Sequence, residues 1–291
     1  MVSDFEAQLR ATNERINART GRPLLRAIGV GLALGLTMMF SLIFVKELYM
    51  LVAAVVIAFT AYELASALRL SGRDVPRVPT VVAAVAVVPA AFYWLAAGHW
   101  LVTLGGIAAI GLWRLVEVAV PSRRVSGADL LRDLGAGAFI MAYVAFLAAF
   151  TVLLTAQDGG QWWTLAFLIV VVTIDTGALA SGLAFGKHPM APRISPKKTW
   201  EGLAGAVVLA VIAGILLALF MLGQPWWVGV ILALTMVVTA TMGDLAESLI
   251  KRDLGIKDSS SWLPGHGGFL DRLDSILLSA AAAYALYVIF G

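Results

Sequence analysis

The sequence predicts an all-α, polytopic membrane helix bundle with about nine transmembrane helices and a cytoplasmic N-terminus. Of its 291 residues, 60% are hydrophobic and only 13% are charged, whereas soluble domains carry about 25% charged residues. Apolar runs long enough to cross a bilayer recur along the whole chain. Basic residues gather in alternate connections between these runs, as they do when they set membrane orientation.

Nine apolar segments approach the ~20 residues that a helix needs to cross the hydrocarbon core. They are residues 24–45, 48–68, 79–97, 100–120, 135–156, 162–183, 203–223, 226–243 and 275–290. The last becomes long enough if its helix begins near Leu270. Residues 1–23 are polar and precede the first apolar run, the wrong order for a cleavable signal peptide. A capping box at Ser3 and Glu6 predicts a short cytoplasmic or interfacial helix there.

The distribution of basic residues orients these spans. Nineteen of the 21 Lys and Arg residues lie at the N-terminal end of the chain, up to Arg26 at the start of the first span, or in the even-numbered connections. This places the longer, polar connections on the cytoplasmic side. Because the cations lie between spans, the pI of 9.3 does not indicate nucleic-acid binding. The absence of cysteine from the sequence excludes disulfides and thiol chemistry.

The polar residues divide the chain into three parts. Residues 1–23 form the cytoplasmic or interfacial segment, and residues 24–160 form a transmembrane scaffold. Residues 161–291 form a C-terminal catalytic region, because its cytoplasmic connections carry most of the polar chain.

Four charged residues fall inside predicted spans, where each costs roughly 2.5–3.5 kcal/mol unless it faces protein or water. Arg114 and Glu117 are three residues apart on one helix and can pair. Glu63 either holds helices together or lines a cavity. Asp175 lies near Gly177, Gly182 and Gly186, which leave one helix side open to backbone or substrate. Its alternative role is structural, with its carboxylate satisfied by Thr173 or Thr176.

Two cytoplasmic stretches carry the residues that suit phosphate chemistry. In residues 192–202, Arg193, Lys197 and Lys198 accompany hydroxyls such as that of Ser195, which suits a polyanion. Prolines fix the shape of this loop, although a basic loop also serves as a topology signal. Further along, Asp244, Glu247, Ser248 and Lys251 share one face if the eighth span stays helical.

A glycine-rich turn at residues 264–268 is followed by a helix that begins with Asp271, Arg272 and Asp274. Asp244 and Asp271 are therefore expected to converge from neighbouring helix ends and to hold Mg²⁺, which takes carboxylates together with substrate phosphates. Asp271 and Asp274 have the alternative role of capping the helix dipole. His266 is either a general base or a hydrogen-bonding turn residue.

Residues 248–274 resemble the signature of the CTP-dependent phosphatidate cytidylyltransferases, also called CDP-diacylglycerol synthases. The matching residues are Ser248, Lys251, Arg252, Lys257, Asp258, His266, Gly267, Gly268, Asp271, Arg272 and Asp274. Segments 175–178 and 185–202 are also similar to the family, so the likeness covers about residues 170–275. The chain departs at Leu179, where an aromatic residue is common, and at Leu183, where a basic residue is common.

The resemblance implies that phosphatidic acid attacks the α-phosphorus of CTP, which yields CDP-diacylglycerol and pyrophosphate in phospholipid biosynthesis. It implies catalytic roles for Asp244, Lys251, Asp271, Arg272 and Asp274. Asp244 and Asp271 would bind Mg²⁺, with Asp274 or Asp175 as a further ligand and a second cation beside it. Substrate binding would fall to Asp175, Ser195, Lys197, Lys198, Ser248, Arg252, Lys257, His266, Gly267 and Gly268. The resemblance further implies a homodimer in the inner membrane with its active site facing the cytoplasm.

Two other functions stay open at this stage. One is another CTP-dependent lipid enzyme, either a polyprenol kinase or an archaeal-type lipid cytidylyltransferase. The other is an ion-coupled transporter that uses Asp175 and Glu63. The sequence carries no repeat, and its polar residues gather at one face rather than at the midplane, which argues against a transporter.

Overall fold

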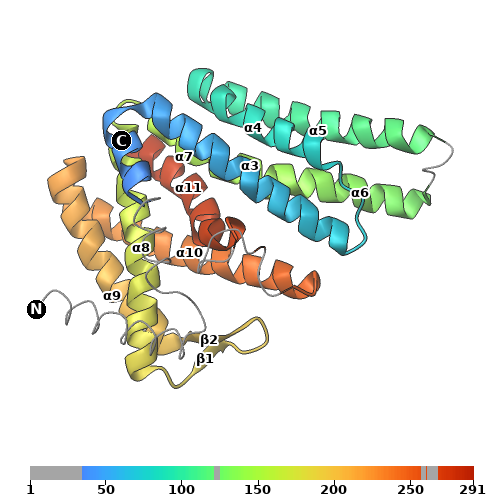
Figure 1. The fold of residues 1–291 in the computed structure, drawn as a ribbon. Coiled ribbons are helices and arrows are strands. Elements are labelled where there is room, and N and C mark those ends of the chain that lie inside the picture. The colour runs from blue at the N-terminus through green and yellow to red at the C-terminus, as the bar shows by residue number, and fades with distance from the viewer. Residues whose placement is uncertain (1–34, 121–124, 257–259, 261–267) are drawn as a thin grey trace, which may run out of the picture.

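The computed structural model describes residues 35–120, 125–256, 260 and 268–291, which form an almost entirely helical fold (Figure 1). A short apolar helix, Gly35–Phe44, comes first. The elements that follow are α3 (Lys46–Leu70), α4 (Arg77–Tyr93), α5 (Leu95–Ala119), α6 (Gly127–Ile140), η2 (Met141–Phe146), α7 (Leu147–Ala156), α8 (Gly160–Phe185), β1 (Pro189–Ala191), β2 (Ser195–Thr199), α9 (Trp200–Leu217), η3 (Ala218–Leu222), α10 (Trp226–Asp253) and α11 (Leu270–Phe290).

Within the described residues, seven helices are long and apolar enough to cross a membrane. One of them, Gly127–Ala156, runs from α6 through the π-helical η2 into α7. The all-α, polytopic prediction is therefore confirmed. The first and third predicted spans correspond to the shorter apolar helices Gly35–Phe44 and Arg77–Tyr93, so the count of nine stays a prediction. Residues 1–34, including the N-terminal capping box, lie outside the described residues.

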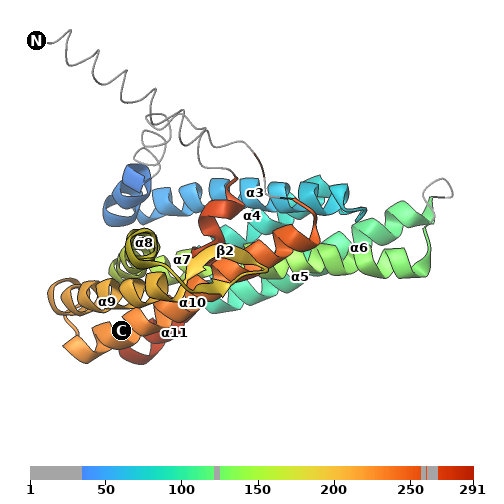
Figure 2. The same cartoon turned by 90° about the horizontal axis from the view of Figure 1, so that it is seen from below.

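The helices pack around two hydrophobic clusters. The first joins α3, α4 and the continuous helix α6–η2–α7, and the second joins α8, α9, α10 and α11. Figures 1 and 2 show α5 and α6 on one side of the molecule and α8 and α9 on the other. Leucines of α11 contribute to both clusters, through Leu277 in the first and Leu286 in the second. The packing of α11 therefore ties the two groups of helices together.

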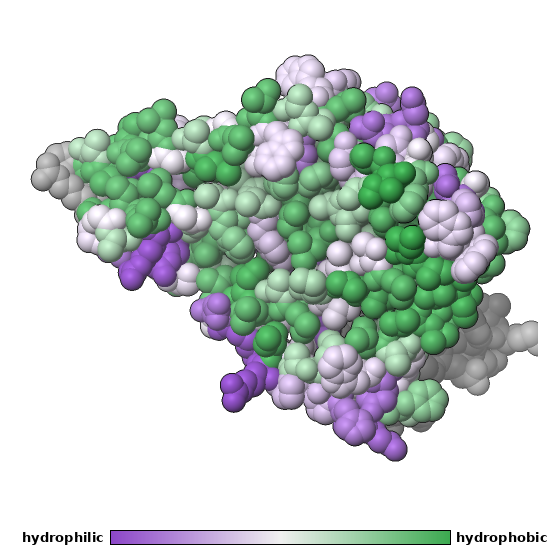
Figure 3. Space-filling model, turned by 180° about the vertical axis from the view of Figure 1, so that it is seen from behind, coloured by the Kyte–Doolittle hydropathy of each residue, from purple (hydrophilic) through white to green (hydrophobic). Residues whose placement is uncertain are grey.

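The outer surface is strongly apolar, as expected for helices that face lipid. On the face drawn in Figure 3, hydrophobic side chains cover most of the surface and hydrophilic ones gather toward its margins. Leu101, Leu112 and Val116 of α5 are each more than half exposed. A soluble protein rarely exposes so large an apolar area, so the surface agrees with an integral membrane protein.

Long-range hydrogen bonds join the connections in two groups, as alternating spans require. On one side, the backbone N–H of Asp74 in the α3–α4 connection donates to Asp133 of α6 over 2.9 Å. On the other, Lys46 Nζ at the start of α3 donates to the carbonyl of Gln157 over 2.9 Å. Tyr287 Oη near the end of α11 donates to the carbonyl of Asp158 over 2.8 Å. The start of α3, the α7–α8 connection and the end of α11 thus meet.

The basic loop at residues 187–199 forms an antiparallel β-hairpin that the sequence analysis did not predict. Its base is fixed to α9 by Glu201. One carboxylate oxygen, Oε2, accepts from the backbone N–H groups of Lys187 and His188, and Oε1 contacts His188 Nδ1 at 2.5 Å. Thr199 closes the hairpin and caps α9, because its hydroxyl accepts from Gly202 N over 3.1 Å. The hairpin therefore holds its cations in fixed places beside α9.

The predicted pair of Arg114 and Glu117 forms, but it belongs to a larger network around the buried Arg114 side chain. The Arg114 side chain is 2% exposed and contacts three carboxylates: Asp133 Oδ2 at 2.9 Å, Asp74 Oδ2 at 3.0 Å and Glu117 Oε2 at 3.1 Å. Asp133 is itself buried, with 4% of its side chain exposed. The network joins α5, α6 and the α3–α4 connection, and it meets the requirement that a charge inside the bundle be paired.

Arg114→Met should lower the free energy of unfolding by about 3–5 kcal/mol, because it leaves the buried Asp133 carboxylate without its cation. The loss will be visible as a lower melting temperature in detergent. Arg132→Met is the matched control, since Arg132 pairs with Asp129 at the surface, where water screens the charges. Equal melting temperatures for the two variants would contradict a structural role for the Arg114 network.

Candidate active site

A cavity of about 450 Å³ lies between α8, α9, α10, α11 and the hairpin. Among the described residues, its lining carries four carboxylates and three cations. These are Asp175 of α8, Lys197 and Lys198 of β2, Asp244 of α10, and Asp271, Arg272 and Asp274 of α11. Ser195, Thr199, Thr241 and Ser275 add hydroxyl groups. So much charge in one cavity suits binding of a polyanion together with a cation.

The close approach of α10 and α11 places two of these carboxylates side by side. A Cβ atom at Gly243 would collide with the backbone carbonyl of Asp274, so only glycine lets the two helices come this near. The next residue on α10 is Asp244. Because α10 stays helical to Asp253, Thr241 and Asp244 lie three residues apart on the cavity face.

Glycines also bring α8 against α9. A Cβ at Gly177 would lie 3.3 Å from the Cα of Ala206, and one at Gly202 would lie 2.9 Å from the carbonyl oxygen of Ala178. The bare side of α8 that the sequence predicted is therefore filled by α9. Asp175, two residues before Gly177, lines the cavity on another side of α8.

Thr173 and Thr176 do not satisfy the Asp175 carboxylate as the structural alternative suggested, and a hydroxyl contact comes instead from Ser275 of α11. The hydroxyl of Thr173 donates to the carbonyl of Ile169 over 2.7 Å, and that of Thr176 donates to Val172 over 2.8 Å. A hydroxyl has one hydrogen to donate, so both donors are used within α8.

Lysines pair with two of the carboxylates. Lys198 Nζ forms an ion pair with Asp244 Oδ2. Lys251 Nζ lies 2.9 Å from Asp271 Oδ1 and 2.6 Å from Glu247 Oε2, which is one helical turn back on α10. The second oxygen of Asp271 accepts from the backbone N–H of Gly268 over 2.7 Å. The strand β2 and the end of α10 thus supply cations to carboxylates on neighbouring helices.

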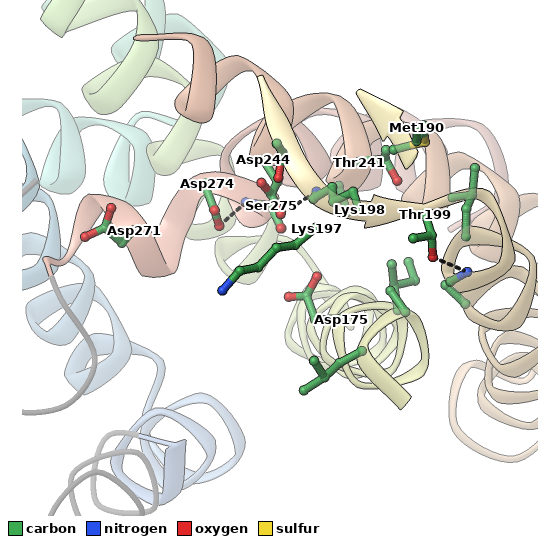
Figure 4. Close-up of a pocket in the computed structure, with 18 of the residues that line it drawn as sticks. Asp175, Met190, Lys197, Lys198, Thr199, Thr241, Asp244, Asp271, Asp274 and Ser275 are labelled. Carbon is green, nitrogen blue, oxygen red and sulfur yellow. Dashed lines mark hydrogen bonds and ion pairs between the residues drawn. The ribbon is translucent and has the colours of Figure 1, made fainter. Parts of the chain in front are cut away.

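Asp244 and Asp271 line the same cavity, but their positions in it differ (Figure 4). In this view Asp175, Asp244 and Asp274 gather in one part of the cavity, while Asp271 lies at its far end. Among the described residues, no group of three or more acidic or histidine side chains is arranged to hold a metal. Mg²⁺ is commonly bound by one or two carboxylates, with waters and substrate phosphates as the other ligands. The hard oxygen donors fit such a cation, and the ligand pair Asp244 and Asp271 stays a prediction.

Eight of the predicted site residues line the cavity. They are Asp175, Ser195, Lys197, Lys198, Asp244, Asp271, Arg272 and Asp274. Ser248 and Lys251 lie behind the lining, where the Ser248 hydroxyl donates to Asp244 over 3.4 Å. Gly268 contacts Asp271 through its backbone, and Arg252 is exposed outside the lining. Lys257, His266 and Gly267 lie outside the described residues, so their predicted roles stay predictions.

The sequence analysis missed several lining residues. Thr241 lies one turn before Asp244, so the same helical spacing that selected Ser248 was a usable signal for it. Ser275 follows Asp274 directly, and its backbone N–H donates to the Asp274 carboxylate over 2.6 Å. Met190 enters the lining only because the hairpin folds back over the cavity, and the sequence carries no comparable signal for it.

Comparison with known proteins shows which family the whole chain resembles. A model of the cytidylyltransferase family matches residues 26–290. A phosphatidate cytidylyltransferase of Mycobacterium bovis is 39% identical over 273 residues, which cover 92% of this chain and 89% of that protein. One of Mycobacterium leprae is 38% identical over 285 residues, covering 92% and 88%.

A third relative aligns with a smaller part of this chain. The phosphatidate cytidylyltransferase of Brucella suis is 41% identical over 149 residues, which is 51% of this chain and 55% of that protein. The family match extends over nearly the whole chain, well beyond the likeness at about residues 170–275 that the motifs had indicated. The chain therefore belongs to the cytidylyltransferase family.

Proposed function

We propose that this protein is a CTP:phosphatidate cytidylyltransferase, which makes CDP-diacylglycerol and pyrophosphate in phospholipid biosynthesis. The observation that carries the proposal is a cavity of mixed charge at the ends of apolar helices, lined by eight of the predicted site residues. The two full-length relatives above bear the same enzyme name. Such a cavity suits a water-borne nucleotide and a lipid whose acyl chains stay among apolar side chains.

The chemistry needs little from a general base. A phosphate monoester has its second pKa near ~6, so the headgroup of phosphatidic acid is largely dianionic at neutral pH. One of its oxygens attacks the α-phosphorus of CTP, the bond to the β-phosphate breaks, and pyrophosphate leaves. The protein must chiefly position two anions and neutralise their charge.

The cations of the cavity are suited to that task. Lys197 and Lys198 of β2 and Arg272 of α11 approach the cavity from different elements, so they can contact phosphates of both substrates. Phosphate oxygens would compete with Asp244 for the Lys198 ammonium. A phosphate could reach the Lys198–Asp244 pair because both side chains are 26% exposed.

Mg²⁺ is part of the proposal. Asp244 and Asp271 would hold it, with Asp274 or Asp175 as a further ligand or as the site of a second cation. When bound, the metal supplies charge neutralisation to the triphosphate. Asp175 and Asp274 are the candidates for that further ligand because Figure 4 shows them in the same part of the cavity as Asp244.

The proposal includes a topology and a location. Nine spans, with the N-terminus inside, put the hairpin and the cavity on the cytoplasmic face of the inner membrane, where CTP is available. The basic connections support this orientation. A homodimer is included on the family resemblance alone, and membrane lipids are the other partners.

Purified protein in detergent with phosphatidic acid and CTP should release pyrophosphate and form CDP-diacylglycerol, and the reaction should stop when Mg²⁺ is chelated. Labelled CTP identifies the products. A lipid kinase would instead leave CDP and transfer the γ-phosphate, which would contradict the proposal. Release of pyrophosphate with another lipid but not with phosphatidic acid would contradict the substrate assignment.

Asp244→Asn and Asp274→Asn should each lower kcat about 10- to 100-fold, because each removes a carboxylate from the charged cavity. Asp253→Asn is the matched control, since Asp253 lies on the same helix α10, outside the cavity lining. Elution of the variants as folded protein on size exclusion excludes misfolding. Near-normal activity of Asp244→Asn at saturating Mg²⁺ would show that the ligand assignment is wrong.

Cysteine labelling tests the topology, because the sequence has no cysteine of its own. The exposed positions in Asp158→Cys and Arg193→Cys lie in the α7–α8 connection and in the hairpin. In intact cells an impermeant maleimide should label the first variant, and it should label the second only after permeabilisation. The opposite pattern would reverse the proposed orientation.

A further inference from the structure

Glu63 of α3 contacts the segment that leads into α11, about 200 positions further along the chain. Its carboxylate is buried, with 2% of the residue exposed. Oε1 accepts from Ser260 Oγ over 2.5 Å and from the backbone N–H of Phe269 over 3.0 Å. Oε2 accepts from the backbone N–H of Leu270 over 3.0 Å. A helix of the scaffold thus binds the start of the helix that carries Asp271, Arg272 and Asp274.

These contacts meet a specific need of α11. The first N–H groups of a helix have no partner within the helix, and together they carry a partial positive charge. Glu63 satisfies two backbone N–H groups at this end with a negative charge. One turn earlier on α3, the ring of Phe59 stacks on Phe269, with centroids 4.9 Å apart and planes 9° from parallel. Polar and apolar contacts therefore fix the same end of α11.

Gly268 lies between Glu63 and the Asp271 carboxylate and connects the two. A Cβ atom at this position would lie 2.7 Å from Glu63 Oε2, so the absence of a side chain lets the carboxylate reach the backbone. The N–H of the same glycine donates to Asp271 Oδ2 over 2.7 Å. One short piece of backbone is therefore held by Glu63 and in turn holds Asp271.

The other oxygen of Asp271 is held from α10. Lys251 Nζ lies 2.9 Å from Asp271 Oδ1, and Glu247 contacts the same ammonium at 2.6 Å. Both oxygens of Asp271 thus have defined partners. One partner, the Gly268 N–H, precedes the two backbone groups that Glu63 binds. The other partner, Lys251 Nζ, is positioned by α10.

We propose that Glu63 is a positioning residue for the reaction: by binding the backbone N–H groups of Phe269 and Leu270, it fixes the adjoining Gly268 and so sets where Asp271 lies in the cavity. The inference rests on the proposed function, since it assigns Glu63 a purpose in that chemistry. It also settles the two roles that the sequence left open for Glu63, because the carboxylate holds a helix end rather than lining the cavity.

Kinetics of Glu63 variants test the proposal. Glu63→Gln keeps the size but replaces one acceptor oxygen with a donor, so about one charge-assisted hydrogen bond is lost and kcat should fall about tenfold. Glu63→Asp keeps the charge and should recover part of that loss. The Mg²⁺ concentration for half-maximal rate should rise severalfold in Glu63→Gln, because Asp271 is displaced. A smaller folded fraction would lower the rate without moving that concentration.

Glu117→Gln is the matched control. It removes a carboxylate of the same scaffold that pairs with Arg114. It should leave the Mg²⁺ dependence unchanged even where it lowers the melting temperature. A fall in kcat of Glu63→Gln with an unchanged Mg²⁺ dependence would overturn the proposal, since that pattern reports only fewer folded molecules.

A second measurement does not depend on turnover. Leu270 is 1% exposed, so in a Leu270→Cys variant the introduced thiol should react slowly with a maleimide in detergent. Adding Glu63→Gln should speed the labelling severalfold, and adding Glu117→Gln should not. Unchanged labelling in the presence of Glu63→Gln would overturn the proposed hold on α11. If the parent protein released no pyrophosphate, the reaction assignment would fail, while this labelling would still support or overturn the contact itself.

Discussion

The pairing of charges within an apolar bundle is the constraint on which this structure depends. Hydrocarbon offers no water to a buried charge or to an unsatisfied backbone group, so each must find a partner in the protein. The partners come from other helices: Arg114 of α5 reaches α6, Glu63 of α3 reaches the start of α11, and Lys251 of α10 reaches α11. These contacts therefore fix how the scaffold and the C-terminal helices are placed.

Two classes of ion pair follow from this constraint, and burial separates them. Arg114 and Asp133 are 2% and 4% exposed, so no substrate reaches them and their role is structural. Lys198 and Asp244 are each 26% exposed and border the cavity. Because water reaches the second pair, its attraction is weaker. Under the proposed function, an incoming phosphate would replace the carboxylate, so the same residue types would serve stability in one place and binding in the other.

The sequence predicted the features that depend on local spacing. Apolar runs indicated the helices, i,i+3 spacing indicated the Arg114–Glu117 pair, and helical continuity of α10 put Asp244 on the same face as Ser248. Contacts between distant segments were not predictable, because no spacing rule connects Glu63 with Leu270. The hairpin was not predicted either, because its strands have only three and five residues, too few to show a period-2 pattern.

Two close helix contacts beside the cavity depend on glycine and not on ion pairs. Gly243 allows the backbone of α10 to touch that of α11 at Asp274, and Gly177 does the same for α8 and α9. These approaches are set by backbone packing, so they do not depend on which partner Lys198 or Asp271 holds. Under the proposed function, Lys198 would therefore exchange Asp244 for a substrate phosphate while these backbone contacts hold the helices in place.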